Sequence, residues 1–360
     1  MNPGDTLELD NGTYDLSSVT VTRSGCELRP ILIMAKNKGQ VILNGATTFV
    51  FRNMEYTTLK GFKFRSSNIG TGIKLENCKK FRVTENDFSY TESSSCTWVY
   101  IGDTYASPIP IRSGYNRVDH NLFDGKTQAG NYIRMDGNIN QQSQYDTIDH
   151  NHFKNNGPRA DNEKESIRVG VSTLSKSSGF TTIEYNLFED CDGDPEVVSI
   201  KSCDNTIRFN TFVRCLGTLC LRQGFRSTAE GNYFFGDNKT GTFNGGTIGA
   251  GGIRVYGKDH KIINNYFSGL TGSKWDAAIT ITNGDVNNNS TSVAEHYLPE
   301  NLIVAHNTLV NNKSNIEIGF TNNGNYPLRP INCLIADNVV IENTTPIITV
   351  HNAAALNGVS

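Results

Sequence analysis

The sequence contains no long apolar run, no CxxC pair and no surplus of positive charge. No stretch approaches the roughly 18 apolar residues of a membrane-spanning helix, so we expect no membrane partner. A formal net charge of −3 gives no electrostatic support to nucleic-acid binding. Without CxxC pairs, zinc-ribbon and thioredoxin-like folds are unsupported, and we interpret the eight cysteines as buried thiols that fill a core.

The 3.6-residue period of an amphipathic helix is also missing. In its place, short β-branched segments alternate with Gly, Asn and Asp, which is typical of strands and turns. One phrase recurs: an apolar pair, a polar step, Asn, one further residue and an apolar residue, as in RVDHNLF and TIDHNHF. The Asn of this phrase occurs at Asn86, Asn121, Asn151, Asn186, Asn210, Asn232, Asn265, Asn307 and Asn338.

The spacing of this phrase predicts a parallel β-helix. Successive Asn residues are 35, 30, 35, 24, 22, 33, 42 and 31 residues apart. A fixed short phrase at variable spacing indicates coils that each add short strands, with insertions looping out between them. We expect the recurring Asn residues to take left-handed backbone at tight corners and to bond one another in a ladder from coil to coil.

We predict a single all-β domain over residues 1–360, since no linker interrupts the repeat. The Gly- and Thr-rich segment 236–252 and the segment 284–300 are predicted to be projecting loops. The open end of a solenoid exposes a sheet edge, so a polar cap is expected there. This chain enters strand-like sequence almost at once, and we therefore expect its N-terminal cap to be missing.

The stretch 193–202, GDPEVVSIKS, places both signs of charge around ordinary strand residues. Lys201 and Arg222 are 21 residues apart on coils of 22 to 24 residues, so they share nearly the same phase. One coil earlier, Arg168 precedes Lys201 by 33 residues, against a coil length of 35. The spacing therefore predicts a column of cations formed by Arg168, Lys201 and Arg222.

Oxygen donors are predicted beside this column, at Asn162, Asp194 and Glu196. Two carboxylates and an amide oxygen suit Ca²⁺, which takes roughly 6–8 oxygen ligands and would keep positions open for water or a substrate carboxylate. Lys201 has the opposite strand parity to both acids, so a bend between them is required if all three face outward. The alternative interpretation is a surface salt-bridge patch, which is a common feature of little energetic value.

Four motifs in order, NxxESIRVG, CDGDPEVVSIKS, GTLCLRQG and GGIRVYGKDHKIINNYF, resemble polysaccharide lyase family 6. The likeness covers nearly the whole chain and includes the opening PGDTLELDNGTYDL. This family contains alginate lyases and the dermatan-sulfate-cleaving chondroitinase B, all right-handed parallel β-helices. The resemblance implies that fold, an acidic polysaccharide substrate and a secreted or periplasmic protein whose signal peptide has been removed.

The resemblance also implies roles for individual residues. The family's Ca²⁺ ligands fall on Asn162, Asp194 and Glu196. Its Brønsted base falls on Lys201 and its Brønsted acid on Arg222. The substrate-binding residues that we expect are Arg168, Gln223, Arg254, His296 and Tyr297.

Two positions depart from the family pattern: the first acidic ligand is usually Glu and is here Asp194, and the LRHG histidine is here Gln223. Two alternatives to an alginate lyase stay open, a dermatan sulfate lyase and a non-catalytic β-helical glycan-binding protein. Sulfate recognition would call for cations in the long loops, and segments 236–252 and 284–300 are poor in them, which favours alginate. A purely structural solenoid leaves the oxygen and cation clusters without a role.

Overall fold

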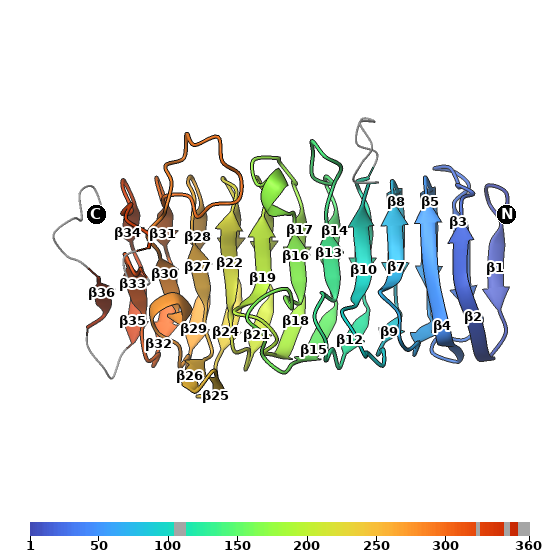
Figure 1. Ribbon diagram of the computed structural model, residues 1–360, viewed down its shortest axis with the longest axis horizontal. Helices are drawn as coiled ribbons and strands as arrows, with labels where there is room; N and C mark the ends of the chain where they lie inside the picture. Colours follow the sequence, from blue (N-terminus) through green and yellow to red (C-terminus); the bar gives the residue numbers. More distant parts are fainter. Residues whose placement is uncertain (104–112, 322–324, 342–345, 352–360) are drawn as a thin grey trace.

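The computed structural model describes residues 1–103, 113–321, 325–341 and 346–351. Short strands run across a long molecular axis, with the N-terminus near one end and the C-terminus near the other (Figure 1). Apart from one small hairpin, all paired strands in the described residues are parallel and pair with strands of neighbouring coils. The chain thus forms the parallel β-helix that the repeat predicts.

Each coil contributes strands to three stacks, described in chain order. The first stack contains β1 (Thr6–Leu9), β3 (Ile31–Ala35), β5 (Glu55–Lys60), β8 (Lys79–Thr84), β11 (Arg117–Asp119), β14 (Thr147–Asp149), β17 (Thr182–Glu184), β20 (Thr206–Arg208), β23 (Thr228–Glu230), β28 (Lys261–Ile263), β31 (Ile303–Ala305) and β34 (Leu334–Ala336).

The second stack is formed by the strand that follows each strand of the first stack from β5 on, after a tight turn. It contains β6 (Lys63–Phe64), β9 (Asp87–Phe88), β12 (Leu122–Asp124), β15 (His152–Asn156), β18 (Leu187–Cys191), β21 (Thr211–Val213), β24 (Tyr233–Phe235), β29 (Tyr266–Ser268), β32 (Thr308–Val310) and β35 (Val339–Ile341).

The third stack carries the charged stretch. It contains β2 (Gly12–Val21), β4 (Val41–Arg52), β7 (Thr71–Glu76), β10 (Thr97–Gly102), β13 (Ile133–Met135), β16 (Ile167–Val169), β19 (Glu196–Lys201), β22 (Thr218–Gln223), β27 (Ile253–Val255), β30 (Ile279–Ile281), β33 (Ile316–Ile318) and β36 (Ile348–Val350). The long strand β4 pairs with both β6 and β7 and so joins the second and third stacks.

The recurring Asn residues form the predicted ladder at the corner between the first and second stacks. In each successive pair from Asn86 to Asn338, the side-chain amide of one Asn donates to the Oδ1 of the next at 2.9 to 3.0 Å. The backbone N–H of the earlier Asn donates to the same oxygen, as between Asn186 and Asn210 at 3.0 Å. Each coil is therefore bonded to the next through a buried amide.

The left-handed backbone at this corner belongs to the residue before the Asn, which corrects the prediction. Positive φ values occur at Glu85, His120, His150, Tyr185 and Phe209, each directly before a ladder Asn. The Asn contributes its side-chain amide, and its neighbour makes the turn. The outward-pointing neighbours stack on one another, with the rings of His120 and His150 4.9 Å apart.

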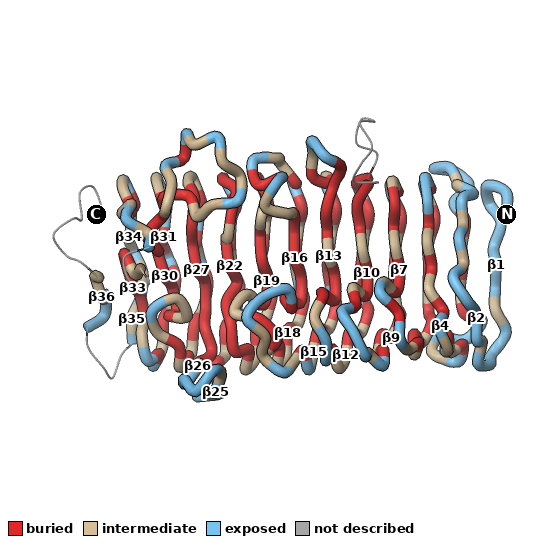
Figure 2. Tube along the Cα trace, in the orientation of Figure 1, coloured by how far each residue is buried: buried red, intermediate tan, exposed pale blue. Residues whose placement is uncertain are grey.

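The interior is a column of apolar side chains, and buried residues recur along the strands of successive coils (Figure 2). Phe64 and the Phe two positions after each Asn from Asn86 to Asn265 form a run of stacked rings that ends at Phe267, with centroids 4.5 to 4.9 Å apart. Burying each such ring contributes about 1.5–3 kcal/mol. Seven cysteines are buried free thiols as predicted, whereas Cys26 is exposed.

The two predicted loops both interrupt the stack pattern. Segment 236–252 contains an antiparallel hairpin of β25 (Thr240–Phe243) and β26 (Gly246–Gly249), which projects from one long edge (Figure 1). Two 3₁₀ turns, η1 (Ser172–Leu174) and η2 (Lys274–Asp276), lie in other connections. Within the described residues, no helix has the length and apolarity to cross a membrane.

Candidate active site

Strands β19 and β22 carry the charges that the sequence singled out, but their register differs from the predicted one. Arg168 of β16 lies opposite Ser199. Lys201 lies opposite Gln223, so Arg222 is displaced from it by one position. The predicted column is therefore only approximate: Lys201 and Arg222 are offset by one position by an irregularity in the β19–β22 pairing, and Arg168 lies opposite a residue two positions before Lys201.

The same irregularities produce the bend that was predicted between the acids and the lysine. One of them lies between Glu196 and Val198. Val197 and Val198 are both buried in the core, so two successive residues point inward. Glu196 and Lys201, which an unbroken strand would place on opposite faces, consequently both reach the outer face, with side chains 13% and 15% exposed.

A groove of about 420 Å³ opens beside β19, β22 and β27. It is lined by Arg159, Asp161, Asn162, Asp194, Pro195, Glu196, Arg222, Arg254, Tyr256, Trp275, Asp276, His296 and Tyr326. The predicted site residues that the structure brings together here are Asn162, Asp194, Glu196, Arg222, Arg254 and His296. The predicted site residues outside this lining are Arg168, Lys201, Gln223 and Tyr297.

Asp194 is buried in the acidic wall of the groove. Its Oδ1 accepts the backbone N–H of Glu196 at 2.9 Å, and its Oδ2 accepts that of Lys164 at 3.1 Å. Burial raises the pKa of Asp194 well above its ordinary value, and the negative charges of Glu165 and Glu196 raise it further. Three carboxylates thus lie close together, and a bound cation would relieve their repulsion.

Glu196 lies among the cations of the site. Burial opposes its ionisation, but the charges of Arg222, Lys201 and Arg254 hold the pKa of its carboxyl below the ordinary value. The Nε of Arg222 is 3.5 Å from Oε1 of Glu196, and the hydroxyl of Ser199 donates to Oε2. Glu196 therefore stays ionised while Asp194 beside it resists ionisation.

The two arginines that line the groove from β22 and β27 are held differently. Arg254 donates from Nη2 to Asp276 at 2.7 Å and from Nε to the carbonyl of Trp275 at 3.0 Å. The guanidinium of Arg222 lies 5.6 Å from the ring centroid of Tyr256, and its buried Nη1 has no hydrogen-bond partner among the described residues. Arg222 thus keeps a donor for a ligand, whereas Arg254 is already fixed in place.

Glu165 is a residue that sequence reasoning missed. Its side chain is 1% exposed, and its Oε1 lies 3.6 Å from Nζ of Lys201. The quoted motif NxxESIRVG contained the signal, because this Glu follows Asn162 by three residues, but only Asn162 and Arg168 were assigned roles. Arg168, three residues further on, faces Asp136 at 3.6 Å.

An aromatic group forms the opposite wall of the groove. The ring of His296 lies 4.9 Å from that of Tyr256 and 4.5 Å from that of Tyr326. Its Nδ1 is 3.0 Å from Oδ2 of Asp285. Burial and the charge of Arg222 lower the pKa of His296 in spite of this carboxylate, which favours the neutral ring.

Sequence reasoning also missed most of the groove lining outside the strands. Tyr256 was within reach, since it follows Arg254 by two residues and so shares its face of the strand. Arg159, Trp275 and Tyr326 lie outside the strands, where no periodicity marks them. Nη1 of Arg159 donates to the carbonyl of Asp194 at 3.0 Å.

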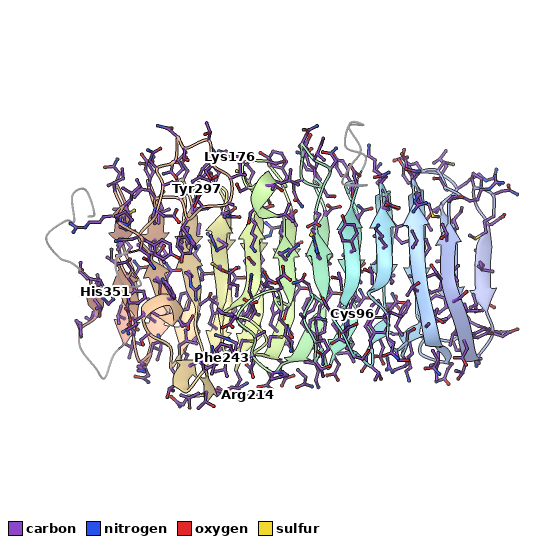
Figure 3. The ribbon with its side chains drawn as sticks, in the orientation of Figure 1. Cys96, Lys176, Arg214, Phe243, Tyr297 and His351 are labelled. Atoms are coloured by element: carbon purple, nitrogen blue, oxygen red, sulfur yellow. The ribbon has the colours of Figure 1, made fainter. Side chains whose placement is uncertain are left out.

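Gln223 and Tyr297 anchor segment 284–300 to the sheet. Gln223 is 1% exposed, and its Nε2 donates to the carbonyl of Glu295 at 3.2 Å. Tyr297 is fully buried against Phe225 and lies at the base of the loop, near one long edge of the molecule (Figure 3). The sequence predicts both residues as substrate contacts. The structure instead buries both at the base of segment 284–300, outside the groove lining.

The oxygen donors meet only part of what a metal site requires. Among the described residues, no group of three or more His, Cys, Asp or Glu is arranged to hold a metal ion. The predicted set relies on an amide instead, since Asn162 lines the groove together with Asp194 and Glu196. Carboxylate and amide oxygens are hard donors, and their chemistry fits Ca²⁺.

The chain matches the family model described as Chondroitinase B over residues 1–358. A search of curated proteins gave no match. Among solved structures, the PL6 family alginate lyase AlyGC is 30% identical, with a TM-score of 0.85. The match covers 100% of this chain and 48% of that one, so the chain spans about half the length of that protein.

Two further structures extend the likeness. A mannuronic acid specific polysaccharide family 6 lyase from human gut microbiota is 26% identical, with a TM-score of 0.82 over 100% of this chain and 79% of that one. The PL6 family polysaccharide lyase Pedsa3628 from Pseudopedobacter saltans is 23% identical, with a TM-score of 0.77 over 99% of this chain and 90% of that one. These values show the predicted fold, the right-handed parallel β-helix.

Proposed function

The chain belongs to the chondroitinase B family, polysaccharide lyase family 6, and from this premise we propose that it cleaves 1,4-linked uronate chains of alginate by β-elimination. One observation carries the proposal: Arg222 and Arg254 line an open groove together with Glu196, and Lys201 lies at the end of the strand that carries Glu196, on the same outer face. This arrangement provides cations for an acidic sugar and a candidate base in one place.

The proposed reaction uses Lys201 and Arg222. The amine of Lys201 takes the proton from C5 of a uronate residue, and the electrons of the C5–H bond form a double bond between C4 and C5. The C4–O4 bond breaks and its electron pair leaves with O4. Arg222 stabilises the charge on O4 through its unpaired Nη1, and we assign it this electrostatic role ahead of proton donation because an arginine is a very weak acid.

We propose Ca²⁺ as the cofactor, held by Asn162, Asp194 and Glu196. When bound, the ion would act as a Lewis acid that neutralises the uronate carboxylate and so makes the C5 proton more acidic. The grouping of Asn162, Asp194 and Glu196 along one groove supports this assignment, since their oxygens are the hard donors that Ca²⁺ takes. Arg254, already fixed by Asp276, is positioned to bind a carboxylate of the substrate.

Alginate is favoured over dermatan sulfate by the charges of the loops. Segment 284–300 contains no Lys or Arg. Lys239 is the cation of segment 236–252, and its Nζ is paired with Asp190 at 2.9 Å and with Asp192 at 2.6 Å. Neither of these two segments thus leaves an unpaired cation for a sulfate group. Because such polymers occur outside cells, we also propose that the protein acts after secretion or in the periplasm.

An assay with alginate tests the proposal. Only β-elimination creates the conjugated C4=C5 double bond, which absorbs in the ultraviolet. We expect this absorbance to rise when the protein and Ca²⁺ are mixed with polymannuronate or polyguluronate, and to stay flat with dermatan sulfate. A rise with dermatan sulfate alone would reassign the substrate, and no rise with any of the three polymers would contradict a lyase function.

A further inference from the structure

Glu165 is held in a fixed position by Asn131, one coil earlier. The side-chain amide of Asn131 donates to Oε2 of Glu165 at 2.8 Å and to its backbone carbonyl at 3.1 Å. Asn131 is 2% exposed and Glu165 is 1% exposed. The other carboxylate oxygen, Oε1, is the one that faces Nζ of Lys201 at 3.6 Å. The geometry therefore points a buried negative charge at the proposed base.

The buried negative charge of Glu165 is destabilising by itself, and Lys201 is the cation that compensates it. Removing a carboxylate from water costs several kcal/mol unless a cation compensates it. Toward the acids the effect of Glu165 is unfavourable, since its charge raises the pKa of Asp194. Among the described residues, Lys201 makes an ion pair with Glu165 of the preceding coil, and its charge also acts on Glu196 of its own strand. Of these contacts, the ion pair with Glu165 is the direct one.

We propose that Glu165 is the positioning residue of Lys201, an inference that rests on the proposed lyase function. Glu165 orients the amine and stabilises the ammonium group that forms when Nζ takes the C5 proton. The carboxylate itself gives up and receives no atom. Because positive charge grows on Nζ during proton transfer, a carboxylate at 3.6 Å stabilises the transition state more than the ground state.

The first test compares Glu165→Gln with Glu163→Gln. The first substitution keeps size and hydrogen-bonding capacity but removes the charge, and Glu163 is an exposed residue of the same segment that serves as a matched control. We expect kcat of Glu165→Gln to fall about 10- to 100-fold with KM nearly unchanged, the pattern of a group that acts in the transition state. Glu163→Gln should retain the wild-type rate.

A second variant covers a failure to fold. Glu165→Asp keeps the charge but withdraws it from Nζ by one methylene, and we expect an intermediate fall in kcat with a native melting temperature. Equal kcat in wild type and both variants would overturn the proposal. So would a loss of Ca²⁺ affinity at unchanged saturating rate, because Glu165 would then belong to the cation site.

A substrate-free measurement separates this inference from the proposed function. Only the neutral amine of Lys201 reacts with an acylating reagent such as acetic anhydride, and mass spectrometry of the peptide that contains Lys201 reports the extent. In Glu165→Gln, loss of the ion pair at 3.6 Å should change the labelling rate of Lys201 relative to wild type at the same pH. Equal labelling rates would overturn the coupling, whether or not the wild-type protein cleaves alginate.

Discussion

The corner between the first and second stacks and the outer face of β19 and β22 use polar groups in opposite ways. At the corner, the ladder amides from Asn86 to Asn307 are buried and bonded to the next coil, as in the bonds of Asn186 to Asn210 and to the carbonyl of Ile148. At the groove, Arg222 keeps a buried nitrogen without a partner in the described residues, and Asp194 resists ionisation. Polar groups stabilise the fold where they are satisfied and are available for chemistry where they are not.

The two regions also differ in regularity. The corner repeats with constant geometry although the coil length varies from 22 to 42 residues. The third stack loses its register within β19, at Glu196/Val198 and at Ile200/Lys201. The first of these shifts, at Val197, brings acid and base side chains to one face. The site is thus built where the repeat is interrupted, which is a common use of strand irregularities.

The largest expected effect is that of Lys201→Ala on activity. Loss of the proposed base should lower kcat by about 10²- to 10⁴-fold, because no other group takes the C5 proton. The melting temperature should fall as well, because the buried carboxylate of Glu165 loses its cation, so kcat is measured at a temperature at which the variant is folded. Lys261→Ala, an exposed lysine of β28, is the control. A variant at position 201 with more than about a tenth of the wild-type rate would remove Lys201 from the base role.

Metal removal should have the next largest effect. We expect a chelator or Glu196→Ala to lower activity by about 100-fold or more, because the substrate carboxylate would lose its stabilising cation. Added Ca²⁺ should restore the chelated wild type and leave Glu196→Ala inactive. Full activity in excess chelator, with no metal in elemental analysis of the protein, would rule out the proposed cofactor.

At the corner between the first and second stacks, an alanine substitution should lower the free energy of unfolding and leave kcat unchanged. Asn186→Ala removes donors to Ile148 and Asn210 and the acceptor used by Asn151. Leaving these buried groups unbonded should lower the free energy of unfolding by about 3 kcal/mol. Denaturant titration measures the loss, and the exposed Asn140→Ala is the control. A large loss of kcat in folded Asn186→Ala would contradict the separation of the two regions.

Much of the fold could be predicted because the Asn phrase marks the repeat directly in the sequence. Its Asn and its following apolar residue build the ladder and the Phe column, and their spacing gave the coils. The left-handed residue was misplaced by one position, since it is the neighbour, for example Tyr185 before Asn186, that makes the turn. Residue type alone does not decide which of two adjacent positions takes positive φ.

The candidate site could be predicted only as a neighbourhood. Spacing placed Asp194, Glu196 and Arg222 near one another, and the structure brings them to one groove. The register inside a coil could not be read, because a shift at Val197 has no signature in β-branched sequence. Burial could not be predicted either. The sequence predicts Gln223 to be a substrate contact, but segment 284–300 covers this residue in the structure.

A smaller effect is expected on the stability of the fold at acid pH, through the buried His260. Burial lowers the pKa of His260 to about 4, and its Nδ1 accepts the N–H of Ser227 at 3.0 Å. The unfolded imidazole titrates near 6.5, so between about pH 6.5 and 4 only the unfolded chain binds the proton. Stability should therefore fall by up to about 3 kcal/mol as pH falls through this window.

The variant His260→Asn tests this pH effect. Its side-chain oxygen can still accept the N–H of Ser227 but cannot titrate. Urea titrations at pH 7 and at pH 4.5 should show a smaller loss of stability in the variant than in wild type. An equal loss in both proteins would mean that His260 does not control the acid response.

The smallest effect is expected for Gln223→His, at the boundary between the two regions. Gln223 lies beneath segment 284–300 and outside the groove, so the substitution should change KM by less than about threefold and leave the reaction type unchanged. Kinetics on polymannuronate and polyguluronate across pH would measure it. A strongly pH-dependent KM would show that position 223 reaches the substrate after all.

The chemical identity of the product tests the central claim most directly. Mass spectrometry of the oligosaccharides released from alginate distinguishes elimination from hydrolysis, because an eliminated chain end lacks one molecule of water. We predict unsaturated oligosaccharides from the wild-type protein and none from Lys201→Ala. Saturated, hydrated products, or intact alginate with the wild-type protein, would contradict the account.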